Sequence, residues 1–217
     1  MMDIVKNFKL LKKTLSDNVK IVAVSKTKSK EKILEIYNTG HKDFGENRIQ
    51  ELKEKYNDLP KDIKWHMIGH VQKNKVKYIA PFIELIHSVD SFKLLGEINK
   101  QAEKNKRIIK CLLQIKIAKE ESKFGLFKDE VEGLILLSNN LKNVKIIGLM
   151  GMATFTDNQK IIDKEFKEIS SLFKNLKILY PQLSILSIGM SSDYLIAINN
   201  GTNMVRIGSQ IFGDRNN

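Results

Sequence analysis

Short apolar runs alternate with longer amphipathic segments along the chain. The run IVAVSK at 21–26 opens with four apolar residues, and IIKCLLQIKI at 108–117 is mostly apolar. Runs of this length and composition are typical of buried strands. The same pattern predicts further strands at 42–46, 64–69, 83–89, 145–152, 184–190 and 204–208.

The segments between these runs carry the signals of helices. SKEKILEIYNTG at 29–40 begins with a serine cap and ends at a glycine, and SFKLLGEINKQAEKNK at 91–106 also begins with serine. IIDKEFKEISSLFKNLKILY at 161–180 repeats apolar residues at three- and four-residue steps and stops before Pro181. Spacing and caps of this kind predict amphipathic helices. The segment 3–16 is a further helix candidate outside the alternation.

Eight short strands, each followed by a helix or a helical loop, predict an α/β fold, a single (β/α)8 TIM barrel with an extra N-terminal helix. We expect one domain over 1–217, with the helix within 1–18 and the barrel over 21–213. The alternative is an open, doubly wound sheet. No Gly-x-Gly-x-x-Gly motif follows the first strand, which disfavours that alternative.

Chemically useful residues gather where the predicted strands end, which is where barrel enzymes place their sites. The strands end, in chain order, at Lys26, FGENR, WHMIGH, HSVDS, MGMATF, GMSSD and VRIGSQIFG, the fifth strand excepted. This distribution is the clearest architectural signal in the sequence.

Lys26 is the first candidate. Side chains alternate along a strand, so Val22, Val24 and Lys26 share one face, which in a barrel is the interior. Removal from water lowers the pKa of a lysine and frees its amine as a nucleophile, which suits a Schiff base with a carbonyl compound. The sequence also allows a lysine that extends into solvent or pairs with a core carboxylate.

The last two strands predict an anion site. SIGMSSDY and VRIGSQIFG each place glycine and serine at a turn that leads into a helix. Small residues let backbone N–H groups approach a ligand, and loops after the seventh and eighth strands are the usual phosphate position in such barrels. We therefore expect a phosphate near Ser191, Ser192, Gly208 and Ser209. The alternative is two capping serines and turn glycines without a ligand.

An inward lysine beside a phosphate site predicts a phosphate-bearing aldehyde, and pyridoxal 5′-phosphate is the candidate cofactor. Arg206 lies two residues before Gly208 and therefore on the same face. A permanent cation there would face the pyridine nitrogen of the cofactor and keep it unprotonated. The alternative is an arginine paired with a barrel carboxylate such as Glu46.

Charge and cysteine content change the picture little. The net charge is +12, but only four of the 37 basic residues are arginines. Arginine is the residue that most often contacts bases and phosphates, so nucleic acid binding is not expected.

The single cysteine, Cys111, is interpreted as a core residue and suits a reducing compartment. No run is long enough to span a bilayer, and the N-terminus lacks the apolar block of a signal peptide. We expect a cytoplasmic protein.

Several segments together resemble a known family. VAVSKTK, FGENRIQE, WHMIGHVQKNK, HSVDS, KFGL, GLMGMA and SIGMSSDYLIAINNGTNMVRIGSQIFG are similar to the signature segments of the pyridoxal phosphate homeostasis protein (YggS/PROSC) family. They occur in the family's order and cover nearly the whole chain. The resemblance implies the fold of the alanine racemase N-terminal barrel domain. It also implies the cofactor pyridoxal 5′-phosphate, with a Schiff base on Lys26, phosphate contacts from Ser191, Gly208 and Ser209, Arg206 near the pyridine nitrogen and Asn47 beside the ring.

Cofactor binding alone does not establish catalysis. Racemases need acid–base groups on both faces of the substrate, and in enzymes similar to alanine racemase the second base is a tyrosine from an extra C-terminal domain. This chain ends directly after its last strand, and of its tyrosines only Tyr194, after the phosphate loop, is a candidate. We therefore expect no catalytic residue and a role in storing or delivering the cofactor. The alternatives are a small racemase or decarboxylase that uses Lys26, and a barrel without a ligand.

Other partners are expected to be few. His66 and His87 are interpreted as hydrogen-bonding histidines at the barrel rim, and His70 as part of a polar loop beside the mouth of the site. None has partners at metal-ligand spacing, so no metal is predicted. We expect a monomer without membrane contact, whose partners are the cofactor and apo forms of enzymes that use it.

Overall fold

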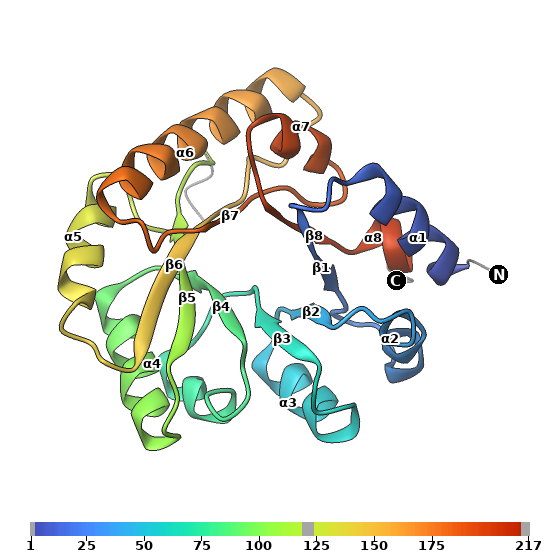
Figure 1. Ribbon diagram of the computed structural model, residues 1–217, viewed down its shortest axis with the longest axis horizontal. Helices are drawn as coiled ribbons and strands as arrows, with labels where there is room; N and C mark the ends of the chain where they lie inside the picture. The colour runs from blue at the N-terminus through green and yellow to red at the C-terminus, as the bar shows by residue number, and fades with distance from the viewer. Residues whose placement is uncertain (1–2, 119–123, 214–217) are drawn as a thin grey trace.

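The apolar runs form eight parallel strands that close into a barrel in chain order (Figure 1). This computed structural model describes residues 3–118 and 124–213. The first strand pairs with both the second and the last, which closes the ring and excludes the open sheet. The strands are β1 (Lys20–Val24), β2 (Asp43–Glu46), β3 (Lys64–Met67), β4 (Leu85–Val89), β5 (Ile109–Ile115), β6 (Val144–Gly151), β7 (Ile185–Ser187) and β8 (Met204–Ile207). The predicted (β/α)8 barrel is confirmed.

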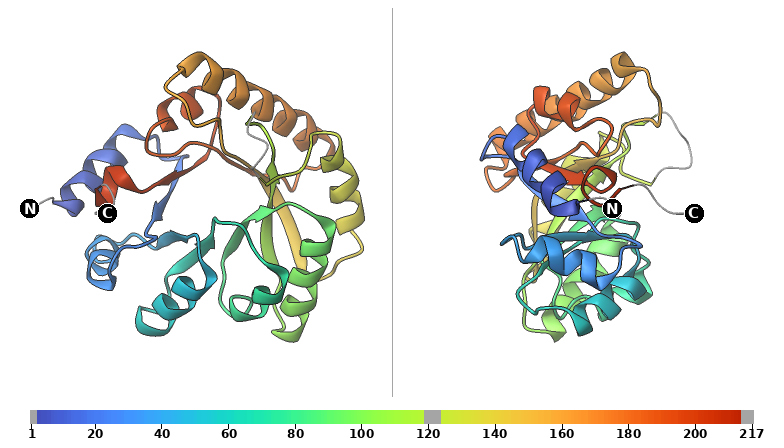
Figure 2. Two further views of the ribbon diagram at one scale, coloured as in Figure 1. Left: turned by 180° about the vertical axis from the view of Figure 1, so that it is seen from behind. Right: turned by 90° about the vertical axis from the view of Figure 1, so that its right-hand side faces the viewer.

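Helices follow the strands and surround them on the outside (Figure 2). Ser91 caps α4, because its Oγ accepts a hydrogen bond from Leu94 N at 3.3 Å, whereas Ser29 stands at the cap position of α2 but its side chain makes no capping hydrogen bond. Among the described residues, no helix is both long and apolar enough to cross a bilayer. The helices are α1 (Ile4–Thr14), α2 (Lys30–Tyr37), α3 (Ile49–Asp58), the 3₁₀ helix η1 (Lys73–Tyr78), α4 (Phe92–Lys104), α5 (Glu130–Ser138), α6 (Gln159–Leu179), α7 (Tyr194–Asn199) and α8 (Ser209–Phe212).

The N-terminal helix α1 is the predicted addition to the repeat. It lies side by side with α8 at the end of the barrel sequence (Figures 1 and 2). Asp3 caps it by accepting a hydrogen bond from Lys6 N at 2.8 Å, and its face of Ile4, Phe8 and Leu11 is buried. The helix therefore covers an apolar area that α2 and α8 would otherwise expose.

The strands separate two apolar layers, as side-chain alternation requires. A large layer between strands and helices contains fully buried Phe44, Trp65 and Phe166. Cys111 lies in this layer, and burial raises the pKa of its thiol, which confirms a core residue without a reactive thiolate. A smaller cluster fills the barrel interior. Its buried members are Val22, Leu85, Leu112, Met150 and Met204.

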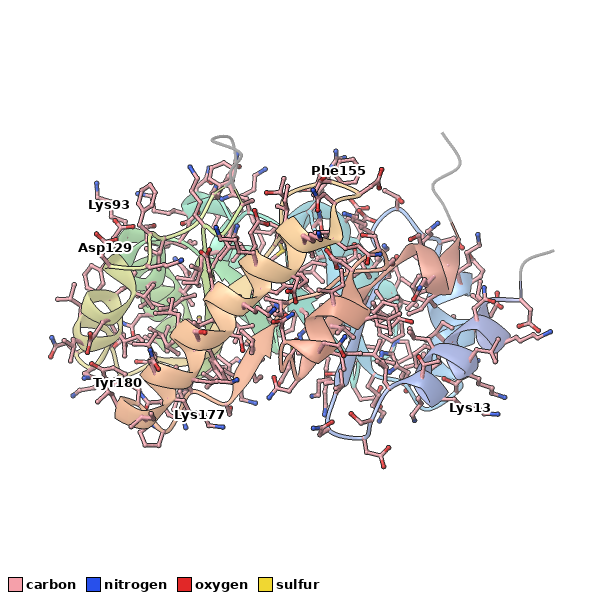
Figure 3. All side chains as sticks on the ribbon, turned by 90° about the horizontal axis from the view of Figure 1, so that it is seen from above. Lys13, Lys93, Asp129, Phe155, Lys177 and Tyr180 are labelled. Atoms are coloured by element: carbon pink, nitrogen blue, oxygen red, sulfur yellow. The ribbon has the colours of Figure 1, made fainter. Side chains whose placement is uncertain are left out.

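Because all strands are parallel, their carboxyl ends form one rim of the barrel. Figure 3 views the barrel from the side and shows Phe155, which follows β6, at this edge of the molecule. Tyr180 and Lys177, at the end of α6, lie at the opposite edge in the same view. Ligand chemistry in this fold belongs at the Phe155 edge.

Candidate functional site

A cavity of about 480 Å³ opens at the carboxyl rim of the barrel. Its walls come from the ends of β1, β2, β3, β6, β7 and β8 and the segments that follow them. The structure brings all six predicted site residues together in this cavity, although their role in binding stays a prediction. They are Lys26, Asn47, Ser191, Arg206, Gly208 and Ser209.

Lys26 reaches the cavity through the expected alternation. Val22 packs in the barrel interior, and Val24 and Lys26 line the cavity above it. The strand itself ends at Val24, so Lys26 belongs to the following turn and is half-buried rather than fully interior. This position gives the amine access to a ligand in the cavity.

The residue before Lys26 is fixed by a buried ionic cluster. Ser25 Oγ donates to Glu46 Oε1 at 2.6 Å, and Lys55 Nζ of α3 donates to the Ser25 carbonyl oxygen at 2.8 Å. Lys55 also pairs with Glu46 at 2.8 Å. Burial raises the pKa of Glu46 to about 7, against the opposing charge and hydrogen bonds of Lys55 and Ser25.

The residue after Lys26 is fixed by the same helix. Thr27 has φ 62°, an uncommon conformation for a residue other than glycine. Its N–H donates to Glu51 Oε1 at 2.6 Å, and Glu51 also pairs with Lys55 at 2.6 Å. The backbone on both sides of Lys26 is therefore attached to α3. We call Ser25, Thr27, Glu46, Glu51 and Lys55 the Lys26 clamp.

The two serine-bearing loops meet beside the carboxyl end of β1, because β8 pairs with β1. The N–H of Gly208, after β8, donates to Ser191 Oγ, after β7, at 3.1 Å. Gly189 starts the first loop with φ +94°, and a Cβ there would lie 2.6 Å from the Cβ of Ala197, so only glycine fits. Hydroxyl groups and the N–H groups that begin α8 together suit an anion.

Arg206 forms the floor of the cavity and is almost completely buried. Its Nη1 donates to the Ser187 carbonyl oxygen at 2.7 Å and to Ser187 Oγ at 2.9 Å, and Nη2 donates to the Gly151 carbonyl oxygen at 2.9 Å. Burial lowers the pKa of Arg206 to about 10, which Asp193 partly offsets, so the guanidinium is charged at neutral pH. The alternative partner, Glu46, is wrong, because Glu46 belongs to the Lys26 clamp.

The position predicted for two histidines is wrong. His66 and His87 are buried inside the barrel, not at its rim, and their rings are hydrogen-bonded to each other at 2.9 Å. Both lie within β3 and β4, where alternation directs them inward. His70 does lie in the loop after β3, where it pairs with Asp90 at 3.3 Å and stacks on Phe124. The described residues contain no group of three or more His, Cys, Asp or Glu placed to hold a metal ion.

Tyr194 does not reach the cavity. It is buried in the layer between strands and helices and is absent from the cavity lining. In the described part of the chain, the ionisable side chains that line the cavity are Lys26, Lys28 and Arg206. The site is therefore cationic, and no carboxyl, imidazole or phenol group of the described residues lines it.

Sequence reasoning missed several lining residues. Lys28 reaches the cavity, and its Nζ donates to the Gly213 carbonyl oxygen at 3.0 Å. The two-residue spacing between Lys26 and Lys28 is the sequence signal that could have identified Lys28 as a lining residue. Phe155 covers the mouth while its side chain is 93% exposed, and no local pattern distinguishes it from other loop aromatics.

The raised pKa of Glu46 predicts a pH-dependent stability. Its carboxyl binds a proton more tightly in the folded than in the unfolded state, so the stabilisation is present below pH ~4.5 and is lost as pH rises through about 7. Relative to Glu46→Gln, the wild type should lose about 1–3 kcal/mol of unfolding free energy between pH 4.5 and 8. Urea denaturation at several pH values measures this. The control is Glu168→Gln, at the surface pair with Lys128. Parallel wild-type and Glu46→Gln curves would contradict the assignment.

The sequence matches known relatives over most of its length. The model of the alanine racemase N-terminal domain matches residues 2–216. Pyridoxal phosphate homeostasis protein of Aquifex aeolicus is 39% identical over 198 residues, covering 90% of this chain and 87% of the relative. The protein of the same name from Helicobacter pylori strain 26695 is 42% identical, covering 89% and 87%.

Solved structures agree with these relatives. PipY of Synechococcus elongatus without PLP has a TM-score of 0.92 and 33% identity, covering 97% of this chain and 100% of PipY. PipY with PLP bound gives 0.89 and 32% at the same coverage. Alanine racemase of Clostridium difficile shares the fold, with a TM-score of 0.81 and 15% identity over 99% of this chain and 60% of that one. The chain belongs to the pyridoxal phosphate homeostasis protein family and carries the alanine racemase N-terminal barrel fold.

Proposed function

We propose that this protein binds pyridoxal 5′-phosphate in the rim cavity and serves cytoplasmic homeostasis of the cofactor by storing and delivering it, without turning over a substrate. The observation that carries the proposal is one cationic cavity that combines an accessible lysine amine, a serine-rich anion wall and a fixed guanidinium. Membership of the homeostasis family and the PLP-bound relative PipY support it.

The cavity fits the cofactor in size and in chemistry. Its volume of about 480 Å³ lies in the range of small-molecule sites. The apolar side chains of Val24, Ile68 and Met152 line it and suit the faces of an aromatic ring. Pyridoxal phosphate supplies an aldehyde that condenses reversibly with primary amines.

Lys26 is the residue that would hold the aldehyde carbon as a Schiff base. The Lys26 clamp fixes its backbone on both sides, while its side chain extends into the cavity. Lys28 lines the same cavity, but its Nζ is engaged with the carbonyl oxygens of Phe212 and Gly213. Attachment is proposed at Lys26 because it follows β1 on the inward face of Val22 and Val24 and lines the cavity.

The phosphate would lie against Ser191, Gly208 and Ser209. The Gly208 N–H and the Ser191 hydroxyl already face each other across the two loops. Two serine hydroxyls and backbone N–H groups form charge-assisted hydrogen bonds to a phosphate, and the nearby lysines add attraction. Ser192 lines the same wall.

Arg206 and Asn47 would contact the ring. Among the described residues, the bonds to Ser187 and Gly151 use three of the five N–H groups of the guanidinium. A remaining N–H can donate to the pyridine nitrogen, which then stays unprotonated and makes the ring a weaker electron sink. Together with a lining that lacks a second acid–base group among the described residues, this favours storage over catalysis.

Attachment to Lys26 can be tested directly. Wild-type protein loaded with pyridoxal phosphate should absorb near the violet, and borohydride reduction followed by peptide mapping should label Lys26. Lys26→Ala should lose the covalent label. Lys28→Ala is the matched control from the same cavity and should keep it. A label on another lysine would make the assignment wrong.

The phosphate wall predicts a loss of affinity. Each serine should contribute about 1.5–3 kcal/mol through a hydrogen bond to a charged group. Ser191→Ala combined with Ser209→Ala should therefore weaken binding of pyridoxal phosphate by about one to four orders of magnitude if the effects add. Ser138→Ala with Ser170→Ala, two serines in helices α5 and α6, is the control. Unchanged affinity in the cavity double variant would move the phosphate elsewhere.

The storage role predicts an absence of turnover. Incubation of the loaded protein with common L- and D-amino acids in deuterated water should give neither racemisation nor steady exchange at the α-carbon. Slow transfer of the cofactor to an apo-enzyme should occur instead, as measured by recovery of that enzyme's activity. Multiple turnovers at ~1 s⁻¹, typical of working enzymes, would favour the racemase or decarboxylase alternative.

A further inference from the structure

A row of polar side chains crosses the barrel interior from one end to the other. Asp43 Oδ1 lies 3.0 Å from His66 Nε2, and His66 Nδ1 lies 2.9 Å from His87 Nε2. His87 Nδ1 lies 3.3 Å from Ser187 Oγ, which accepts from Arg206 Nη1 at 2.9 Å. We call these five residues the interior chain. It begins at the first residue of β2 and ends at the floor of the rim cavity.

The bonds of the interior chain have one consistent direction. A carboxylate only accepts, so His66 Nε2–H donates to Asp43, and in a neutral ring His66 Nδ1 is then an acceptor. His87 Nε2–H then donates to His66, and His87 Nδ1 accepts from the hydroxyl of Ser187. Arg206 donates to Ser187 in turn. Every link is satisfied when both imidazoles are neutral and carry their proton on Nε2.

The two ends of the interior chain carry charges. Burial, together with the charge of Arg206, holds the pKa of His87 well below its ordinary value. Burial also raises the pKa of Asp43, but its hydrogen bonds with His66 and Lys20 outweigh burial and bring that pKa to about 2. Lys20 Nζ lies 3.3 Å from Asp43, and His41 Nε2 contacts the Asp43 carbonyl oxygen. The interior chain therefore connects a carboxylate to a guanidinium through two imidazoles and a hydroxyl.

The apolar side chains around the interior chain strengthen its hydrogen bonds. The interior cluster of Val22, Leu85, Leu112, Met150 and Met204 excludes water from the middle of the barrel. In such a medium hydrogen bonds polarise one another, and an unpaired member is costly. Ser187 keeps its hydroxyl oriented toward His87 only while His87 Nδ1 accepts, which presents the Ser187 oxygen to Arg206.

We propose that Asp43, His66 and His87 are positioning residues that act through Ser187 to orient Arg206 and to stabilise its charge at the cavity floor. The inference rests on the proposed function where it concerns the cofactor. Asp43 lies at the opposite end of the barrel from Lys26, so its effect on the cavity requires the interior chain. None of the three residues lines the cavity.

The proton arrangement can be tested without the cofactor. Full-length protein labelled with ¹⁵N-histidine should show His66 and His87 as neutral Nε2–H tautomers in NMR spectra between pH 6 and 8. In Ser187→Ala, the Nδ1 resonance of His87 should shift because it loses its donor. A neutral Nδ1–H tautomer at either histidine in the wild type would overturn the inference.

The influence on the cavity is tested with two matched pairs of variants. Asp43→Asn keeps the shape and an acceptor oxygen but removes the charge, and Asp163→Asn makes the same change at the surface. Ser187→Ala cuts the last link, and Ser170→Ala removes another buried serine. The first member of each pair should bind pyridoxal phosphate about three- to thirtyfold more weakly, and the controls should match wild type. The pH at which the bound chromophore changes absorbance should also move in the first members only.

The outcomes separate the two proposals. If wild-type protein fails to bind pyridoxal phosphate, the proposed function fails, and the tautomer spectra still decide the interior chain. If wild type binds, and Asp43→Asn and Ser187→Ala match their controls in both affinity and pH profile, the inference is overturned while the proposed function stands. A loss of thermal stability without either change would likewise reduce the interior chain to a structural role and overturn it.

Discussion

Arg206 carries a positive charge inside a closed barrel, where loss of hydration costs several kcal/mol unless acceptors replace water. Two carbonyl oxygens and one hydroxyl, supplied by β6 and β7, meet this requirement. The guanidinium can be bonded in this way only if β6, β7 and β8 lie side by side, so barrel closure and the cavity floor depend on each other. Because the buried guanidinium needs polar partners, the barrel interior cannot be entirely apolar. The interior chain through His66 and His87 fills the part of the barrel that the apolar cluster leaves.

Two cationic residues of the cavity are held in different ways. Lys26 is held through its backbone, because the clamp contacts the residues on either side of it. Arg206 is held through its side chain, by bonds to its own guanidinium. A lysine that forms and breaks a covalent bond needs a mobile side chain on a fixed base. A cation that sets the electrostatics of a ring nitrogen must stay still while ligands come and go.

The fold and the inward position of Lys26 follow from alternation, which is a local property of the sequence. The histidines and the clamp do not, because their partners are far apart in the chain. His66 and His87 are 21 residues apart, and Ser187 is another 100 residues beyond His87. A histidine near the end of an apolar run looks the same whether its strand stops there or continues, and only the register of neighbouring strands decides between rim and interior.

A store for a reactive aldehyde has to bind its anionic part firmly and its carbonyl reversibly. Lys26, Lys28 and Arg206 give the cavity a positive potential that attracts a phosphate before any covalent bond forms. In the proposed storage role the covalent bond would depend on one amine, and its hydrolysis would return both partners unchanged. Catalysis on an amino acid would additionally need a group that removes a proton from carbon and another that returns it. All three ionisable residues of the described lining are cationic, which supports the proposal that the cavity holds the cofactor and does not use it in catalysis.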